Sequence, residues 1–248
     1  MLYGNESISQ YNKSNVAIWM AMAFQAGVLN VGGFMACHRF VSHVTGFATY
    51  FALEVSQPDL THAYGMLAVP FFFLFGSMLS GYLVDLRLKL HKLPKYYITF
   101  GIMFVLLLVV TIGGEKGFFG TFGEPLTYSK DYLLLMLLCL VCGIQNATIT
   151  SVSRSVVRTT HLTGITTDLG IGIIRVLNKD KIGSEIGDEQ KANWMRTGII
   201  LFFVFGSVIG GLLFKSCGYD GFWIPTITTG TLFLLMLYYR LIKSHSTT

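Results

Sequence analysis

The sequence predicts an all-α polytopic membrane protein built from two inverted repeats, each with three long spans and one short interrupted or re-entrant helix. Three observations lead to this prediction. Hydrophobic residues fill 52% of the 248 positions and charged residues only 12%, whereas soluble domains carry about 25% charged residues. Several long windows contain no charged residue and no histidine. Three blocks of sequence also recur, in the same order, in the second half of the chain.

The charge-free windows define the expected spans, because crossing a bilayer core takes about 20 helical residues. The windows are Val16–Met35, Tyr64–Val84, Tyr96–Gly114, Tyr132–Ser153, Thr197–Phe214 and Gly221–Tyr239. Two shorter apolar segments, Val41–Val55 and Leu162–Val176, interrupt the series. We therefore expect a polar tail (1–15), a first repeat (16–114), a connecting loop (115–131), a second repeat (132–241) with a polar loop (178–193), and a tail (242–248).

The repeated blocks connect the two halves. The sequence GVLN (27–30) returns as GIQN (143–146), SHVTGFAT (42–49) as THLTGITT (160–167), and FLFGSMLSG (73–81) as FVFGSVIGG (203–211). Their offsets are 116, 118 and 130 residues, so the second copy has gained 12 residues, which the polar stretch 178–193 explains as a loop. Internal similarity on this scale indicates a duplicated membrane fold.

The distribution of Lys and Arg predicts the topology. If all eight apolar segments crossed, these residues would divide ten to eight between the two sides of the membrane. If each short segment enters and returns, they divide fourteen to four. Cytoplasmic loops are enriched in Lys and Arg, so we expect six crossings with both termini in the cytoplasm. Three crossings in each half give the two halves opposite orientations.

The duplicated motif HxTGxxT suggests a binding site. Ser42 and Thr160 are good N-cap types, so each motif is expected to begin a short helix. In an inverted repeat two such helix starts approach from opposite faces, and their positive ends suit a small anionic solute near the midplane. The candidate substrate-binding residues are Asn30, His43, Thr45, Gly46, Thr49, Asn146, His161, Thr163, Gly164 and Thr167. Alternatively, these side chains only satisfy backbone groups at helix breaks.

Asp168 is a separate candidate, because Tyr50 occupies the matching position in the first half. An acidic residue inside an apolar segment is costly and often marks an ion or proton path. Its alternative role is an ion pair with Arg154, Arg158 or Arg175. We assign Arg39, Arg154 and Arg158 as charge partners of the site and place Glu54, outside it, at the membrane interface.

The repeated glycines and the cysteines have packing explanations. Gly206 and Gly210 form a GxxxG face that either joins the two halves or makes a homodimer. Cys139 and Cys142 form a CxxC inside a charge-free window, where small apolar packing is the favoured interpretation. We expect no metal, no cofactor and no nucleic-acid partner; the expected partners are the lipid bilayer and a small molecule or ion.

The motifs resemble those of a known family. GVLN followed by FVSHVTG (40–46), and GIQNA (143–147) followed by VRTTHLTG (157–164), are similar to the YoaK family of bacterial membrane proteins, which are six-spanning and of unknown function. The resemblance covers residues 17–241 and implies a bacterial inner (cytoplasmic) membrane location but no reaction. The chain departs from the family in having Asn30 where Asp is common and Phe47 where Asn is common, so a charge-dependent role at these positions is not expected.

Three functions remain open from the sequence. A small secondary transporter or channel is the leading hypothesis, because transporters often build their sites from inverted repeats with broken helices. A membrane-embedded enzyme is the second, although the sequence has no nucleophile elbow, HExxH motif or phosphate loop. The third is an assembly or sensor protein that transports nothing.

Overall fold

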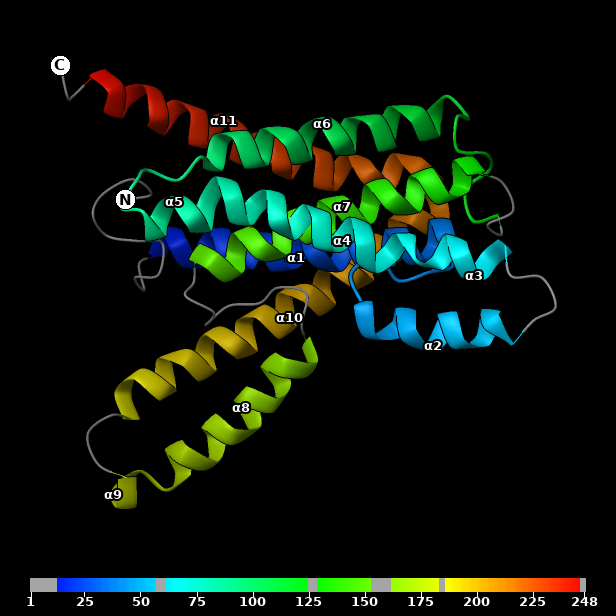
Figure 1. The fold of residues 1–248 in the computed structure, drawn as a ribbon. Helices are drawn as coiled ribbons and strands as arrows, with labels where there is room; N and C mark the ends of the chain where they lie inside the picture. The colour runs from blue at the N-terminus through cyan, green and yellow to red at the C-terminus, as the bar shows by residue number, and fades with distance from the viewer. Residues whose placement is uncertain (1–12, 57–60, 125–128, 153–161, 183–185, 246–248) are drawn as a thin grey trace.

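The computed structural model describes residues 13–56, 61–124, 129–152, 162–182 and 186–245, and these are helical over most of their length (Figure 1). The described residues contain no strand, which confirms the all-α prediction. The long helices are α1 (Lys13–Cys37), α6 (Tyr96–Glu115), α7 (Ser129–Val152), α10 (Ile186–Cys217) and α11 (Trp223–His245). Another long rod comprises α3 (Thr61–Met66), α4 (Ala68–Ser80), the π-helical turn η1 (Gly81–Asp85) and α5 (Leu86–Lys89).

The shorter elements connect these rods. They are α2 (Val44–Val55), α8 (Leu162–Leu177), α9 (Lys179–Ile182) and the 3-10 turn η2 (Gly218–Phe222). Five apolar stretches within the described residues are long enough to cross a membrane, and the fifth, Gly187–Leu241, is 55 residues long and covers most of both α10 and α11. Each of the six predicted windows therefore falls on one rod, as expected of a polytopic membrane protein, although α10 begins 11 residues before its window.

The rods of the two halves run in opposite directions. In Figure 1, α1 and α6 run from left to right, while their counterparts α7 and α11 run from right to left. The rod from α3 to α5 runs right to left and its counterpart α10 left to right. The start of α1 and the end of α11 consequently lie at the same end of the bundle.

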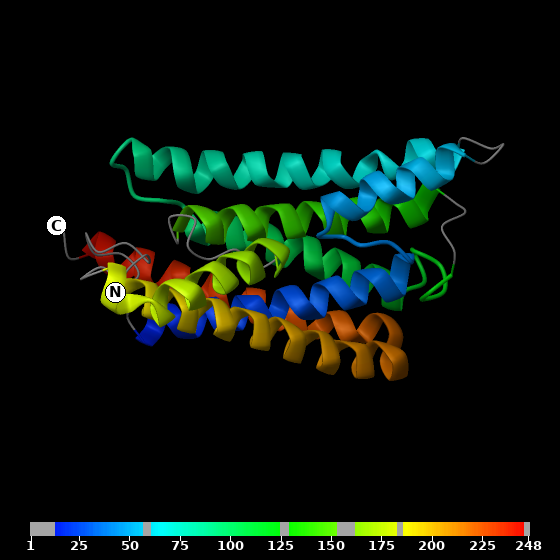
Figure 2. The same ribbon diagram turned by 90° about the horizontal axis from the view of Figure 1, so that it is seen from below.

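The main helix contacts form between the halves. Helix α1 packs chiefly against α10, α4 against α7, and α6 against α11. Each short helix, by contrast, lies on the second rod of its own half: α2 on α3 and α4, and α8 on α10. Figures 1 and 2 both show α2 and α8 beginning near the middle of the bundle and leading toward opposite ends.

One expectation was wrong. The polar stretch 178–193 was predicted to be a loop, but α9 occupies 179–182 and α10 already begins at Ile186. The residues from 188 to 193 are mostly good helix formers, and Asp188 and Glu189 in the first turn of α10 interact favourably with the helix dipole. The helix therefore extends well beyond its charge-free window.

Candidate functional site

The duplicated glycines lie where the two halves cross. A side chain at Gly27 of α1 would overlap the carbonyl oxygen of Phe203 in α10, and a side chain at Gly206 of α10 would overlap that of Phe24 in α1. Gly210 continues the same face against Val28. Only glycine allows the two backbones to approach this closely. The GxxxG face therefore joins the two halves within one chain.

The second crossing repeats the first. A side chain at Gly76 of α4 would overlap the carbonyl oxygen of Leu140 in α7, and one at Gly143 of α7 would overlap that of Phe73 in α4.

A serine bond is duplicated as well. The Ser207 hydroxyl donates to the Gly27 carbonyl at 3.3 Å, and the Ser77 hydroxyl donates to the Gly143 carbonyl at 3.3 Å. The crossings of α1 with α10 and of α4 with α7 are thus built from corresponding residues.

The first duplicated motif begins α2, but with a different cap from the one expected. The N-cap residue is His43, without a hydrogen bond from its side chain to the helix. The Ser42 hydroxyl instead donates to the Asn30 side-chain oxygen at 2.7 Å, and Ser42 is buried. The prediction that Ser42 caps the helix was wrong. Ser42 and Asn30 together tie the start of α2 to the last part of α1.

Arg39 anchors α2 from its other end. Its guanidinium forms an ion pair with the Glu54 carboxylate at 2.6 Å and lies 4.8 Å from the centre of the Tyr50 ring. Both charged side chains are about four-fifths buried, at 20% and 19% exposure. The interface assignment had left Glu54 out of the site, but Glu54 is the partner of Arg39. The sequence signal for this ion pair was a single carboxylate, Glu54, 15 residues after a single arginine, Arg39.

The remaining residues of the first motif lie on the open side of α2. Thr45 and Thr49 are exposed, one turn apart, while His43 and Gly46 are half-buried. The His43 ring lies 5.1 Å from the ring of Phe40, measured between centroids. This helix has no buried residue. The two threonine side chains are therefore accessible from outside the helix bundle.

The described part of the second motif has a similar arrangement. Thr163 and Thr167 are exposed on α8, and Gly164 is half-buried. The Thr167 hydroxyl donates to the Thr163 carbonyl at 2.9 Å, so this hydroxyl satisfies its own helix backbone. Asn146 is buried in α7 at 8% exposure. The predicted residues Arg154, Arg158 and His161 lie outside the described residues.

Asp168 is exposed on α8, and Arg175 is not its partner. Arg175 instead pairs with Glu189 at 3.0 Å, and the same carboxylate receives Arg196 at 2.6 Å. Gly172 of α8 lies directly against this cluster. The three charges therefore attach α8 to the first turns of α10. The acidic side chain of Asp168 makes no ion pair within the described part of the chain.

The helices that carry the two motifs, α2 and α8, begin at a similar height in the bundle but are not joined by a hydrogen bond between the described residues of the motifs. Figures 1 and 2 agree that α2 and α8 begin near the same level of the bundle. Among the described residues, no hydrogen bond connects the 42–49 block to the 162–167 block. The arrangement presents two helix starts and four exposed threonines at mid-height.

A buried polar cluster, which the sequence analysis missed, joins three helices. The Gln25 amide of α1 donates to the Gln145 side-chain oxygen of α7 at 2.9 Å. The Thr228 hydroxyl of α11 donates to the Gln25 side-chain oxygen at 2.5 Å. The Gln145 amide donates to the Met22 carbonyl at 2.9 Å. These side chains carry no charge, so the charge pattern does not indicate them; the sequence signal for the cluster is Gln25 and Gln145, two amides inside charge-free windows.

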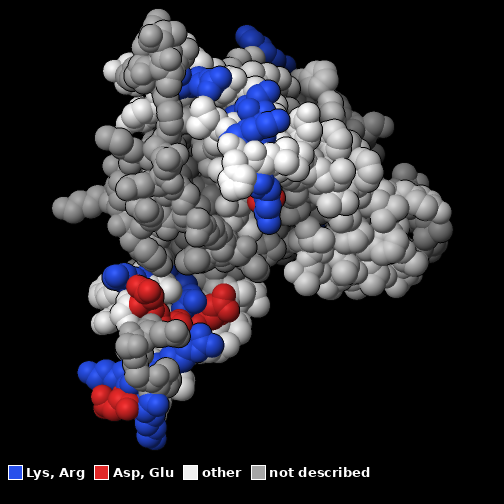
Figure 3. Space-filling model, turned by 60° about the vertical axis from the view of Figure 1, so that its left-hand side comes forward, with Lys and Arg blue, Asp and Glu red and all other residues white. Residues whose placement is uncertain are grey.

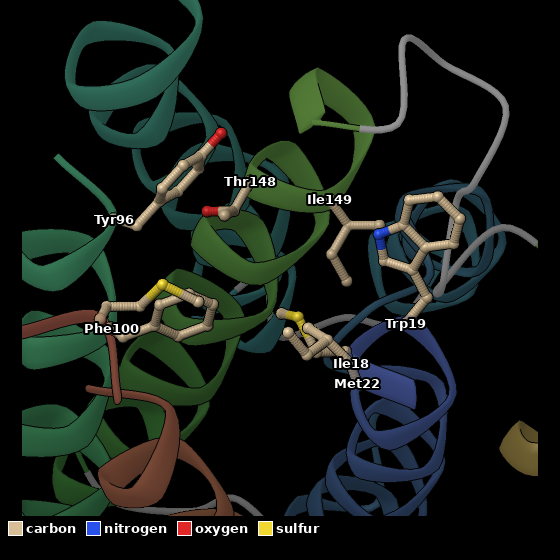
Figure 4. A pocket seen from close by; sticks show the side chains of 8 residues that line it. Ile18, Trp19, Met22, Tyr96, Phe100, Thr148 and Ile149 are labelled. Carbon is tan, nitrogen blue, oxygen red and sulfur yellow. The ribbon is translucent and has the colours of Figure 1, made fainter. Parts of the chain in front are cut away.

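A small cavity lies between α1, α6, α7 and α11 (Figure 4). Its volume is about 20 Å³, room for about one water molecule. Apolar side chains such as Ile18, Met22 and Phe100 surround it in Figure 4, with Thr148 as a polar neighbour. The cavity is too small and too apolar to hold an anionic solute.

The cysteines do not form a site. Cys139 and Cys142 are free and buried in α7, which is the packing role expected for them. Cys217 at the end of α10 is exposed. Within the described residues, no group of three or more His, Cys, Asp or Glu side chains could hold a metal ion.

Comparison with known proteins gives one match. A family described as "Protein of unknown function (DUF1275)" matches residues 18–235. No curated protein and no solved structure matches the chain.

Proposed function

The chain belongs to the DUF1275 family of proteins of unknown function, and from that premise we propose that it is a small secondary transporter or channel for a small, anionic solute. The proposed site lies at mid-height, between the starts of α2 and α8, and uses the duplicated HxTGxxT motifs. We place the protein in the bacterial inner membrane with both termini in the cytoplasm. Its two halves, 16–114 and 132–241, act as inverted repeats.

The matched crossings carry this proposal. Gly27 with Gly206 and Gly143 with Gly76 are corresponding residues at two equivalent contacts, and the corresponding rods run in opposite directions. Alternating access in transporters of this type is a movement of one repeat against the other around a fixed central site. Two equivalent glycine contacts supply surfaces of matched geometry for such a movement.

The placement of the short helices supports the site. Both begin partway along the bundle, where irregular backbone is tolerated only inside protein or beside a cavity that water can enter. The exposed hydroxyls of Thr45 and Thr163, with the half-buried His43, provide hydrogen-bond donors near two positive helix ends. We assign Asp168, which is exposed one residue after Thr167, as the residue for ion or proton coupling.

The ion pairs give each short helix an anchor. Arg39 with Glu54 fixes α2, and Arg175 of α8 with Glu189 of α10 fixes α8, while Arg196 holds the same carboxylate from within α10. The first anchor is about four-fifths buried, while Arg175 in the second is 56% exposed. Exposed pairs contribute little free energy. We therefore assign α8 as the helix that moves more easily when solute enters.

The test is a ligand screen followed by a flux assay. Purified protein would be heated with chloride, nitrate, bicarbonate, phosphate, formate, acetate, lactate and succinate at several pH values. A ligand at a hundred times its dissociation constant stabilises the folded state by about 2.7 kcal/mol, which a thermal shift detects. Any hit would then be assayed for flux into liposomes that contain the protein.

Matched variants decide whether the motif is the site. Thr45→Val/Thr163→Val removes two exposed hydroxyls at nearly constant volume. The control, Thr166→Val, removes an exposed hydroxyl of α8 that lies outside the duplicated positions. We expect the double variant to lose both the thermal shift and flux, while Thr166→Val keeps both. A double variant that transports normally, or no flux of any stabilising anion, contradicts the proposal.

A further inference from the structure

The connection from α5 to α6 is strongly basic, and its counterpart in the second half is not. Residues 86–95 contain Arg87, Lys89, Lys92 and Lys95, with Asp85 as the nearest acidic neighbour in sequence. The corresponding segment of the second half follows the block 203–211 and leads from α10 into α11. It has one lysine, Lys215, and one acidic residue. The duplicated fold therefore forms this connection without a basic cluster. The enrichment of cytoplasmic loops in Lys and Arg accounts for the number of cations on this side of the membrane, but not for how they are arranged.

Three of these cations line a pocket. Arg87, Lys92 and Lys95 surround a cavity of about 150 Å³, together with Tyr82 and leucine side chains that include Leu86 and Leu90. In the described part of the chain, none of the three cations forms an ion pair, and Asp85 does not line the pocket. The pocket therefore carries positive charge without an acidic partner.

Backbone contacts hold the pocket in shape. The Arg87 Nε donates to the Leu93 carbonyl at 2.7 Å, which orients the guanidinium and leaves its two Nη groups for another acceptor. The Lys92 amide donates to the Arg87 carbonyl at 2.8 Å, and the Lys95 amide to the Leu83 carbonyl at 3.0 Å. These bonds close a tight turn around His91, whose φ is 54°. The three cations are thereby brought to one side of the turn.

The apolar side chains beside the cations indicate where this pocket lies. Tyr82, Leu86 and Leu90 are 68%, 44% and 53% exposed, and they end an apolar rod long enough to cross a membrane. Figure 3 shows basic side chains gathered over the upper part of this end of the molecule, while the projecting α8 to α10 region mixes both charges. Exposed leucines next to cations are the arrangement expected at the boundary between acyl chains and headgroups.

We propose that this pocket binds the phosphate of an anionic phospholipid headgroup. The Arg87 guanidinium supplies paired N–H donors to the phosphate oxygens, and Lys92 and Lys95 add two point charges. The exposed leucines contact the acyl chains below. A free phosphate ion would use the cations alone, so the adjoining apolar surface favours the lipid. The inference concerns only this pocket and is independent of whether the protein transports a solute.

The test measures lipid binding by the full chain in detergent micelles. Native mass spectrometry and thermal unfolding would follow titrations with dioleoyl-phosphatidylglycerol, dioleoyl-phosphatidylcholine and inorganic phosphate. The site variant is Arg87→Gln/Lys92→Gln/Lys95→Gln. The control, Lys89→Gln/Lys179→Gln/Lys181→Gln, loses the same net charge from exposed positions that do not line the pocket.

Each basic side chain of the pocket that contacts the headgroup contributes about a fivefold gain in binding, whereas the control residues lie outside the pocket. The site variant should therefore bind phosphatidylglycerol roughly a hundredfold more weakly, and the control should keep the native affinity. Phosphatidylcholine and inorganic phosphate should bind far more weakly than phosphatidylglycerol to the native protein.

Three results would overturn the proposal: an equal loss in the control, equal binding of phosphatidylcholine, or stabilisation by inorganic phosphate as large as that by lipid. If the triple variant does not fold, Lys92→Gln alone changes one exposed side chain. It should bind phosphatidylglycerol about fivefold more weakly. Native affinity in this single variant would also reject the lipid site.

Discussion

The side-chain amide of Gln25 donates to the side-chain oxygen of Gln145 at 2.9 Å, so the first long helices of the two halves are joined by a buried hydrogen bond. Gln25 and Gln145 are 0% and 1% exposed. The Thr228 hydroxyl and the Met22 carbonyl complete the cluster. Buried polar groups without partners are costly, so the four groups stabilise the bundle only as a complete set.

Gln145→Leu should destabilise the protein, because it leaves the buried Gln25 amide without its acceptor. The expected loss is about 1–3 kcal/mol in the free energy of unfolding, measured by thermal or denaturant unfolding in micelles. Gln25→Leu/Gln145→Leu removes both partners and should cost less than Gln145→Leu alone. A double variant that loses as much stability as Gln145→Leu, or more, would contradict this account of the cluster.

Gly206→Ala should destabilise the crossing of α1 with α10, because the new methyl group meets the backbone of Phe24. Overpacking of this kind costs about 1–3 kcal/mol. Gly76→Ala should cost a similar amount at the crossing of α4 with α7. The control is Gly170→Ala on α8, where a new Cβ has no neighbour within 4 Å and the better helix former adds about 0.5–1 kcal/mol. Equal unfolding temperatures for Gly206→Ala and Gly170→Ala would contradict the close approach.

Glu54→Gln should loosen α2, because the largely buried Arg39 loses its charged partner. Removing one member of a buried pair costs about 3–5 kcal/mol, and this pair retains 20% and 19% exposure, so we expect a loss near the lower end of that range. Asp188→Asn is the matched control, since its pair with Lys191 is exposed and should change stability by less than about 1 kcal/mol. Equal losses in the two variants would mean that the Arg39 pair does not hold α2.

Cysteine labelling should distinguish six crossings from eight. The native Cys217 is exposed while Cys37, Cys139 and Cys142 are buried, so Cys217 reports the side at which α10 ends. With six crossings, an impermeant maleimide added to intact cells should label Cys217, and should label Lys89→Cys in a Cys217→Ser background only after the membrane is made permeable. With eight crossings, the two positions lie on one side and should react alike.

The long rods could be predicted because their signal is local. Twenty consecutive apolar residues are visible in the sequence, and each predicted window coincides with a rod. The duplicated glycines were also visible, and GxxxG correctly indicated close backbone contact. The sequence could not indicate which helix Gly206 approaches, because that choice depends on contacts between residues about 180 positions apart.

The details of the site were less predictable. Ser42 has the preferred chemistry of an N-cap, yet its hydroxyl bonds to Asn30, 12 residues earlier in the chain. A partner that folding brings close competes successfully with the local helix end. Glu54 was predicted to lie at the membrane interface. The chain reverses direction after α1, however, and this brings Arg39 next to Glu54. Gln25, Gln145 and Thr228 carry no charge, so the pattern of ionisable residues in the sequence could not indicate that these side chains meet inside the bundle.

The exchange of partners between the halves has a consequence for biosynthesis. Helix α1 is made first, but its principal neighbour, α10, is made only after about 150 further residues. Helix α4 likewise awaits α7. The glycine face of α1 therefore remains uncovered in the bilayer during most of translation, and that of α4 remains uncovered until α7 has been made. Two separately expressed fragments, cut in the connection between α6 and α7, should each insert and then require the other for protection from proteolysis.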